Sequence, residues 1–231
     1  MLNKELHRSI LIDVLKEIYS DSSLGPILGF KGGTALYLFH NLDRFSVDLD
    51  FNLLDLSVEE KVFQRILEIV KSYGPLKDHA IKRFGALIAI NYSKGNHRLK
   101  LDISNRQTND SYELRLYLGI PVKVMVLEDM AANKLMALTE RKTPAARDVF
   151  DMNFILKNYI DINEKLIKDR LNMSLKDQLA YSIDYLEDNF KSNLLDGLGE
   201  LVDDKQKAWI QNKMKEDTIM RLKLRLDSLN S

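Results

Sequence analysis

Cysteine is absent from the 231 residues of this chain. That absence excludes disulfide bonds and thiol catalysis, and it agrees with a reducing cytoplasm. Long apolar runs are missing too, since no stretch reaches the roughly 20 residues that cross a bilayer. The net charge is zero, because 34 basic residues balance 34 acidic ones, so no global attraction draws the chain to nucleic acid or membrane. We therefore expect a cytoplasmic protein without a membrane partner, in which any polyanion site is a local patch.

The composition that is present is an ordinary globular one, with 45% apolar and 29% charged residues. This balance argues against wholesale disorder, and the length suffices for one large domain or two modest ones with a sizeable core. The N-terminal segment MLNKELHRSILIDVLKEIYSD carries acidic residues throughout and has no small-residue cleavage site. We therefore expect no secretory signal at this end.

The first half of the chain mixes two periodicities. The segments ILGF, VDLDFNLL and IPVKVMVL are typical of strands, whereas the apolar spacing from Leu6 to Ile18 is typical of an amphipathic helix. ALIAINYS and HRLKLDIS are expected to form a hairpin that turns at Lys94-Gly95-Asn96. From Pro144 onward, strand patterns vanish and helical periodicity continues to the end of the sequence.

These patterns predict an α+β fold in two parts. Residues 1–125 are expected to form an α/β lobe with a small mixed β-sheet flanked by helices. Residues 126–231 are expected to form an all-helical lobe. No internal repeat or low-complexity segment interrupts either part.

Two aspartates, Asp48 and Asp50, stand in an otherwise apolar, strand-like run. Residues i and i+2 of a strand point to the same face, roughly 6 to 7 Å apart, so the two carboxylates share one face and their apolar neighbours share the other. Carboxylates this close resist joint ionisation unless a cation lies between them. Magnesium suits the pair, because it takes carboxylate oxygens, keeps several waters and bridges to substrate phosphates.

A third carboxylate is a usual requirement of two-metal phosphoryl and nucleotidyl transfer. Asp102 lies on the polar face of the expected strand HRLKLDIS, where it meets the pair if the two strands adjoin. We therefore predict that Asp48, Asp50 and Asp102 bind magnesium or manganese. The alternative is a solvated strand face or a surface salt bridge, which is the commoner explanation of an isolated Asp-x-Asp.

The glycines Gly32 and Gly33 lie between an expected strand and an expected helix. At such a turn, backbone N–H groups and the helix dipole can hold an anionic phosphate close. A lone Gly-Gly carries little weight. Two glycines, a helix, Asp-x-Asp on the next strand and then a third aspartate form a far more specific series.

The stretch that contains the two glycines and the paired aspartates resembles a motif of a known protein family. KGGTALYLFHNLDRFSVDLDF resembles the first motif of the nucleotidyltransferases related to DNA polymerase β, and more narrowly that of the AbiEii/AbiGii toxin family of type IV toxin–antitoxin and abortive-infection systems. KLDIS resembles the strand of the third carboxylate, EDMAANKLMAL the lysine-bearing helix, and ARDVFDMNFIL the Arg-Asp-x-x-Asp-hydrophobic motif. The similarity covers about residues 25–157. The chain departs from the superfamily in having Gly-Gly-Thr in place of the commoner Gly-Ser.

The resemblance implies a nucleotidyltransferase site in the first lobe, with a nucleoside triphosphate as substrate and pyrophosphate as product. It also implies a growth-inhibiting toxin, with tRNA or another RNA as acceptor and a separately encoded antitoxin as partner. Two alternatives stay open. One is a nucleotidyltransferase that modifies a protein hydroxyl, as in AMPylation, and the other is a catalytically silent binding module.

The resemblance also implies roles for single residues. Lys134 is expected to contact a nucleotide phosphate, with Asp148 or Asp151 fixing Lys134 or the base. Arg44 is expected to contact phosphate or orient the strand, and a salt bridge to Asp48 is the competing possibility. The expected catalytic residues are Asp48, Asp50, Asp102, Lys134, Asp148 and Asp151, and the expected nucleotide-binding residues are Lys31, Gly32, Gly33, Thr34, Arg44, Ser46, Lys134 and Arg147.

Each of these assignments has a structural competitor. Lys31 could be a surface lysine, and Asp148 and Asp151 could belong to a helix-surface ion network in which Arg147 reaches Asp151. Either Thr34 or a backbone amide is expected to replace the phosphate-binding serine of the superfamily.

A basic segment lies near the C-terminus. Residues 205–225 contain seven Lys or Arg and two acidic residues. We expect the RNA acceptor to bind there, and the alternative is a solvated helix face. Trp209 is expected to pack in the core rather than to stack on a base. The basic residues expected to contact RNA are Lys213, Lys215, Lys223 and Arg225.

Overall fold

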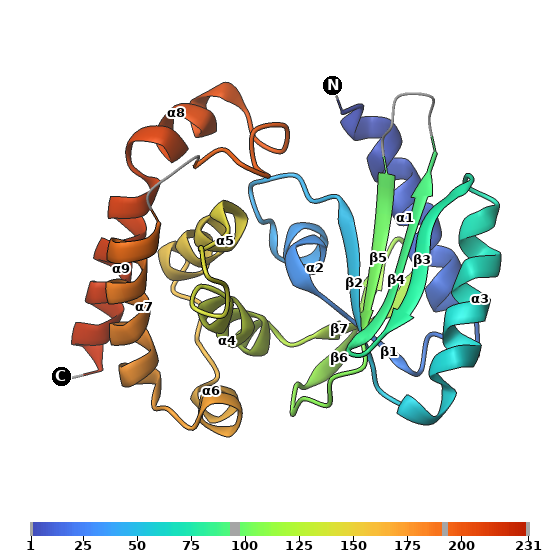
Figure 1. The fold of residues 1–231 in the computed structure, drawn as a ribbon, viewed down its shortest axis with the longest axis horizontal. Coiled ribbons are helices and arrows are strands. Elements are labelled where there is room, and N and C mark those ends of the chain that lie inside the picture. The colour runs from blue at the N-terminus through green and yellow to red at the C-terminus, as the bar shows by residue number, and fades with distance from the viewer. Residues whose placement is uncertain (1, 93–97, 191–193, 230–231) are drawn as a thin grey trace. The chain divides into compact units, whose positions relative to one another are not determined.

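The computed structural model describes residues 2–92, 98–190 and 194–229. It divides into two compact units (Figure 1). The first unit comprises residues 1–41 and 45–125, and the second comprises Leu42–Arg44 and Val126–Ser231. The main division falls after Met125, and the short segment Leu42–Arg44 belongs with the second unit.

The first unit is built on a mixed β-sheet, which has seven strands among the described residues, in the order β3-β4-β5-β2-β1-β7-β6. β2 pairs in parallel with β5, β1 pairs in parallel with β7, and the other neighbours are antiparallel. This sheet confirms the predicted fold class. The strands are β1 (Leu28–Lys31), β2 (Asp48–Leu53), β3 (Leu76–Lys82), β4 (Gly85–Asn91), β5 (Arg98–Ser104), β6 (Tyr112–Tyr117) and β7 (Ile120–Met125).

One face of the sheet forms the core of the first unit. Alternate residues of the central strands, such as Phe51 of β2 and Leu101 of β5, are fully buried. Helices α1 (Lys4–Ser20) and α3 (Glu59–Lys71) pack on this face (Figure 1). Burial of each large apolar side chain stabilises the fold by ~1.5–3 kcal/mol. The residues between them in the strands therefore point to the other face, where polar side chains are tolerated.

Both strands of the predicted hairpin are present. β4 pairs with β5 in antiparallel fashion from Gly85 opposite Ser104 to Asn91 opposite Arg98. The predicted turn at Lys94-Gly95-Asn96 lies outside the described residues. β6 was not predicted, and it lies at the edge of the sheet.

The second unit is helical throughout its described residues, as predicted. Side chains cap three of its helices: Asn163 caps α6, Ser174 caps α7, and Asp203 forms a capping box at α8. Helix α9 packs against α5 and α7. The helices are α4 (Leu127–Ala137), α5 (Ala146–Lys157), α6 (Glu164–Leu171), α7 (Leu175–Asn189), α8 (Asp204–Asn212) and α9 (Met214–Ser228).

No helix within the described residues combines the length and the apolar character that a membrane span requires.

Candidate active site

The paired aspartates begin strand β2, and the register of the sheet places a third carboxylate beside them. Asp50 lies opposite Asp102 in the parallel pairing of β2 with β5, and Asp48 lies opposite Lys100. On the other side, Asp50 lies opposite Lys31 of β1. Residues in register on neighbouring strands share a face, so the three carboxylates and two lysines lie together on the polar face of the sheet. We call Asp48, Asp50 and Asp102 the aspartate face.

The aspartate face is accessible to solvent. Asp48 and Asp50 are partly exposed, and the Asp102 side chain is 49% exposed, with one oxygen 3.5 Å from Lys100 Nζ. Hard oxygen donors of this kind suit Mg²⁺ or Mn²⁺. Within the described residues, however, no three His, Cys, Asp or Glu side chains come close enough together to hold a metal ion by themselves.

The glycine turn brings the Asp50 carboxylate against the start of α2 (Gly32–His40). Gly32 has φ +80°, and a Cβ at this position would lie 2.4 Å from Asp50 Oδ2. Both facts require glycine, because other residues avoid this backbone conformation and would clash with the carboxylate. The turn therefore places the N-terminal end of a helix, which attracts anions, directly beside the aspartate face.

The side chains of Thr34 and Ser46 link the start of α2 to the start of β2. Thr34 is fully buried, and its hydroxyl lies 2.8 Å from Ser46 Oγ and also contacts the backbone carbonyl of Asp48. Ser46 is buried as well. The nucleotide contact expected of these two side chains stays a prediction, and it would require their buried environment to open. Of the two alternatives for the missing serine, a backbone amide of the glycine turn fits better than Thr34.

His7 is a supporting residue that the motifs did not single out. It is buried, and its ring lies 2.9 Å through Nε2 from the Val47 carbonyl and 2.5 Å through Nδ1 from the Tyr92 hydroxyl. With Nε2 as donor to the carbonyl and Nδ1 as acceptor from the hydroxyl, both contacts are satisfied. The ring thus anchors the residue that precedes Asp48.

The second unit holds a different charged group, which we call the buried charge cluster: Arg44, Lys134, Asp148 and Asp151. Lys134 Nζ lies 2.9 Å from Asp148 Oδ1 and 2.7 Å from Asp151 Oδ2. Arg44 donates to both oxygens of Asp151, at 2.6 and 2.7 Å. Asp151 is therefore a bidentate partner of Arg44. Two cations balance two carboxylates in the cluster.

Burial and pairing set the protonation of the cluster. Burial by itself lowers the pKa of Lys134, but attraction by Asp148 and Asp151 outweighs it and raises that pKa above the usual range. Burial raises the pKa of Asp151, but Arg44 and Lys134 outweigh it and lower that pKa. The stabilising charges are therefore complete from about pH 4 to about pH 10. Stability is lost as the pH rises through the folded pKa of Lys134 or falls through that of Asp151.

One atom of the cluster keeps an unused hydrogen-bonding capacity. Asp148 Oδ2 is buried and has no hydrogen-bond partner among the described residues, and Arg141 Nε is 3.8 Å away. Lys134 itself is 14% exposed. Arg147, which was also expected to bind nucleotide, lines a separate recess of about 280 Å³ together with Arg141.

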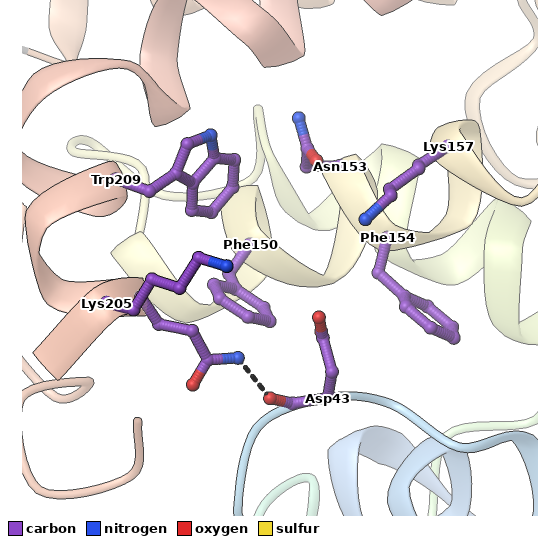
Figure 2. Close-up of a pocket in the computed structure, with 8 residues that line it drawn as sticks. Asp43, Phe150, Asn153, Phe154, Lys157, Lys205 and Trp209 are labelled. Atoms are coloured by element: carbon purple, nitrogen blue, oxygen red, sulfur yellow. Dashed lines mark hydrogen bonds between the residues drawn. The ribbon is translucent and has the colours of Figure 1, made fainter. Parts of the chain in front are cut away.

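A larger recess, of about 380 Å³, opens between α5 and α8 in the second unit. Figure 2 shows the rings of Phe150 and Trp209 on its wall and the side chains of Lys157 and Lys205 pointing into it. Trp209 meets Phe150 edge to face at 5.8 Å, and its Nε1 donates to Asp217 at 2.7 Å. Trp209 therefore packs against Phe150 and Asp217 but is only partly buried, so it does not lie in the core as predicted.

Two of the four basic residues predicted to contact RNA form ion pairs within the second unit. Lys223 pairs with Glu187 at 2.9 Å, and Lys215 donates to the Glu187 carbonyl at 3.0 Å. Arg225 pairs with Asp161 at 3.3 Å. Three of the four cations named for this surface are thus committed to contacts within the second unit.

Comparison with known families decides the class of this protein. The model of the family described as nucleotidyl transferase AbiEii toxin, type IV toxin–antitoxin system, matches residues 13–218. The chain belongs to this family. It is therefore a nucleotidyltransferase toxin, and membership implies a nucleoside triphosphate substrate and an antitoxin partner.

Solved structures share the fold of this chain. JHP933 from Helicobacter pylori is 26% identical with a TM-score of 0.54, and the match covers 100% of this chain and 97% of that one. MenT4, a nucleotidyltransferase toxin from Mycobacterium tuberculosis H37Rv, is 18% identical with a TM-score of 0.55, covering 96% and 90% of the two chains. No curated protein matches this chain.

Proposed function

We propose that this AbiEii toxin transfers a nucleoside monophosphate from a nucleoside triphosphate to a hydroxyl of RNA, with tRNA as the acceptor. The observation that carries the proposal is the register that sets Asp102 beside Asp50, on the same face as Asp48 and next to the glycine turn. Both proposed substrates are cytoplasmic molecules, so we place the reaction in the cytoplasm.

Asp48 and Asp50 would hold Mg²⁺ or Mn²⁺. Magnesium is usually bound through one or two carboxylates together with substrate phosphates, so a cage of three carboxylates is not required. When bound, the ion supplies positive charge that neutralises the triphosphate and polarises its α-phosphoryl group. The backbone amides of Gly32 and Gly33 are proposed to hold a phosphate at the start of α2.

Asp102 is proposed to act as the general base. The acceptor hydroxyl oxygen forms a bond to the α-phosphorus, and the bond from that phosphorus to the bridging oxygen of the β-phosphate breaks. Pyrophosphate leaves, and the hydroxyl proton passes to the Asp102 carboxylate. Its solvent exposure and its place at the side of Asp50 support this role.

Lys134 is proposed to contact a nucleotide phosphate. Asp148 and Asp151 keep its ammonium group charged and hold it in one position, which is what a phosphate contact needs. Arg44 acts on Lys134 through Asp151 and is a positioning residue. Arg147 remains a proposed nucleotide contact on the same helix as Asp148.

The experiment uses each of the four nucleoside triphosphates, labelled on the α-phosphate. The purified protein is incubated with tRNA, with total RNA from which tRNA has been removed, or with a protein extract, with magnesium or with a chelator. We expect label on tRNA, with one base preferred and none transferred in chelator. Label on a polypeptide with RNA untouched would favour the AMPylation alternative.

A further inference from the structure

A basic pocket lies over the polar face of the sheet in the first unit. It has a volume of about 540 Å³ and surrounds the tip of the hairpin that joins β3 to β4. Asp102 is in its lining, so the pocket reaches the aspartate face. We call it the hairpin pocket. Its basic and aromatic members are Lys31, Lys82, Arg83, Phe84, Lys100 and Arg106.

Three cations of the hairpin pocket differ from Lys223 and Arg225 of α9, which are held in ion pairs. Among the described residues, no carboxylate pairs with Lys82, Arg83 or Arg106 in an ion pair. Lys100 faces Asp102 at 3.5 Å. Lys31 and Lys100 lie beside the carboxylates of the aspartate face, so the excess positive charge of the pocket comes from Lys82, Arg83 and Arg106, in a chain whose net charge is zero. Such an excess attracts a polyanion.

Phe84 gives the pocket a second kind of contact. Its side chain is 53% exposed at the tip of the hairpin. The guanidinium carbon of Arg106 lies 4.7 Å from the ring centroid, and that of Arg83 lies 5.0 Å away. Both guanidinium groups lie over the ring, so a planar base that stacks on Phe84 would displace one of them, and the displaced arginine could pair with a flanking phosphate.

The backbone holds this tip close to β5. Gly85 has φ +133°, and a Cβ there would lie 2.0 Å from the Ile103 carbonyl oxygen. Glycine therefore allows the hairpin to approach the strand that carries Asp102. Ser104 lies opposite Gly85, and Asp102 lies opposite Leu87, so the ring of Phe84 and the proposed base come from adjoining strands.

We infer that the hairpin pocket binds the single-stranded end of the RNA acceptor, with a base on Phe84 and the flanking phosphates at Arg83 and Arg106. This inference rests on the proposed function, in which Asp102 must meet the acceptor hydroxyl. An unpaired end fits because a base inside a duplex is already stacked and cannot lie on a side-chain ring. The acceptor surface is thereby assigned to the first unit instead of to α9.

The test compares two pairs of substitutions that remove the same charge. One variant is Arg83→Ala with Arg106→Ala in the hairpin pocket, and the other is Lys213→Ala with Lys223→Ala on α9. A single-stranded RNA of about eight nucleotides, labelled with a fluorophore, is titrated at several salt concentrations, and nucleoside triphosphate affinity is measured by calorimetry. The hairpin pair should weaken RNA binding by roughly tenfold to a hundredfold and flatten its salt dependence by about two counterions. The α9 pair should change neither affinity.

Phe84→Ala separates stacking from charge. Loss of one base stack should weaken RNA binding by roughly fivefold to a hundredfold at unchanged net charge, and Phe84→Trp should restore it. Because Phe84 is exposed, the melting temperature should not change. Unchanged RNA affinity in both hairpin variants would overturn the inference, as would an equal loss of nucleoside triphosphate affinity or a loss confined to the α9 pair.

This inference and the proposed function fail separately. Wild-type protein that transfers no nucleotide to any RNA would refute the proposed function. Transfer to RNA that continues at the wild-type rate and KM in the hairpin variants would refute only the hairpin pocket.

Discussion

The two units of this toxin handle charge in opposite ways. In the first unit, the carboxylates of the aspartate face lie side by side and stay open to solvent. In the second unit, Asp148 and Asp151 are buried and are held by Lys134, with Arg44 on Asp151. Exposed like charges destabilise a fold slightly and gain a cation readily, whereas buried charges must be neutralised inside the protein. The comparison supports the proposal that the aspartate face carries the chemistry, and it indicates that the buried charge cluster stabilises the second unit.

The largest expected effect is on activity at the aspartate face. Asp48→Ala should lower nucleotide transfer by about a thousandfold or more, because charge stabilisation in the transition state is lost. The melting temperature should stay the same or rise, since one of two repelling carboxylates is gone. Initial rates with labelled nucleotide and a thermal melt measure both quantities. Wild-type activity in magnesium, seen also in the isosteric Asp48→Asn, would contradict the assignment.

The next effect is on stability, and it should appear in the second unit alone. Asp151→Ala leaves Arg44 and Lys134 buried with one carboxylate fewer, so the free energy of unfolding should fall by ~3–5 kcal/mol. Asp102→Ala is the matched control, because it removes an exposed carboxylate and should change stability by about 0.5 kcal/mol or less. Urea unfolding of both variants measures the difference. Equal losses would remove the distinction between the two groups of charges.

Lys134 tests whether the cluster also takes part in binding. Lys134→Ala should weaken nucleoside triphosphate affinity by roughly tenfold to a thousandfold, through loss of a charge-assisted phosphate contact. Lys207→Ala, in an exposed ion pair with Asp204, is the control and should leave the affinity unchanged. If calorimetry finds the same nucleoside triphosphate affinity in the wild type, Lys134→Ala and Lys207→Ala, then Lys134 serves only as a structural counter-ion.

The smallest effect separates backbone strain from the clash with Asp50. Gly32 and Gly119 have nearly the same φ, +80° and +84°, but a Cβ at Gly119 meets nothing within 4 Å. Each substitution by alanine should cost about 1–2 kcal/mol of strain. Only Gly32→Ala should also displace Asp50 and lower transfer. If Gly119→Ala reduced transfer as strongly, the close approach at Gly32 would not explain the glycine.

The sequence predicted the architecture because periodicity reports which residues are buried. Alternation in VDLDFNLL placed Asp48 and Asp50 on one face, and the register confirms that they share it with Asp102. The helical second half followed from its 3.6-residue pattern. Strand β6 was not predicted, because it lies at the edge of the sheet and its Leu114 and Leu116 are exposed. Its apolar residues therefore do not form the buried face by which a strand is recognised in a sequence.

Contacts between residues that are distant in the sequence were harder to predict than helices and strands. Arg44 and Asp151 are 107 positions apart in the sequence, so no local pattern predicts their ion pair. Thr34 looked like a substitute for a phosphate-binding serine, and only packing reveals that its hydroxyl is buried. The basic segment near the C-terminus looked like an RNA surface because its acidic partners, Glu187 and Asp161, lie on distant parts of the chain. The roles assigned to the site residues stay predictions.

Manganese binding is the sharpest test of whether the aspartate face holds the metal ion. Electron paramagnetic resonance can count Mn²⁺ ions bound in the presence of a non-hydrolysable nucleoside triphosphate, for the wild type, for Asp48→Asn and for Asp148→Asn. We expect Asp48→Asn to lose bound Mn²⁺ beyond what the free nucleotide analogue holds, whereas Asp148→Asn should retain it as long as the protein is folded. Undiminished Mn²⁺ binding by Asp48→Asn, or its loss in a folded Asp148→Asn, would show that the aspartate face is not the metal site.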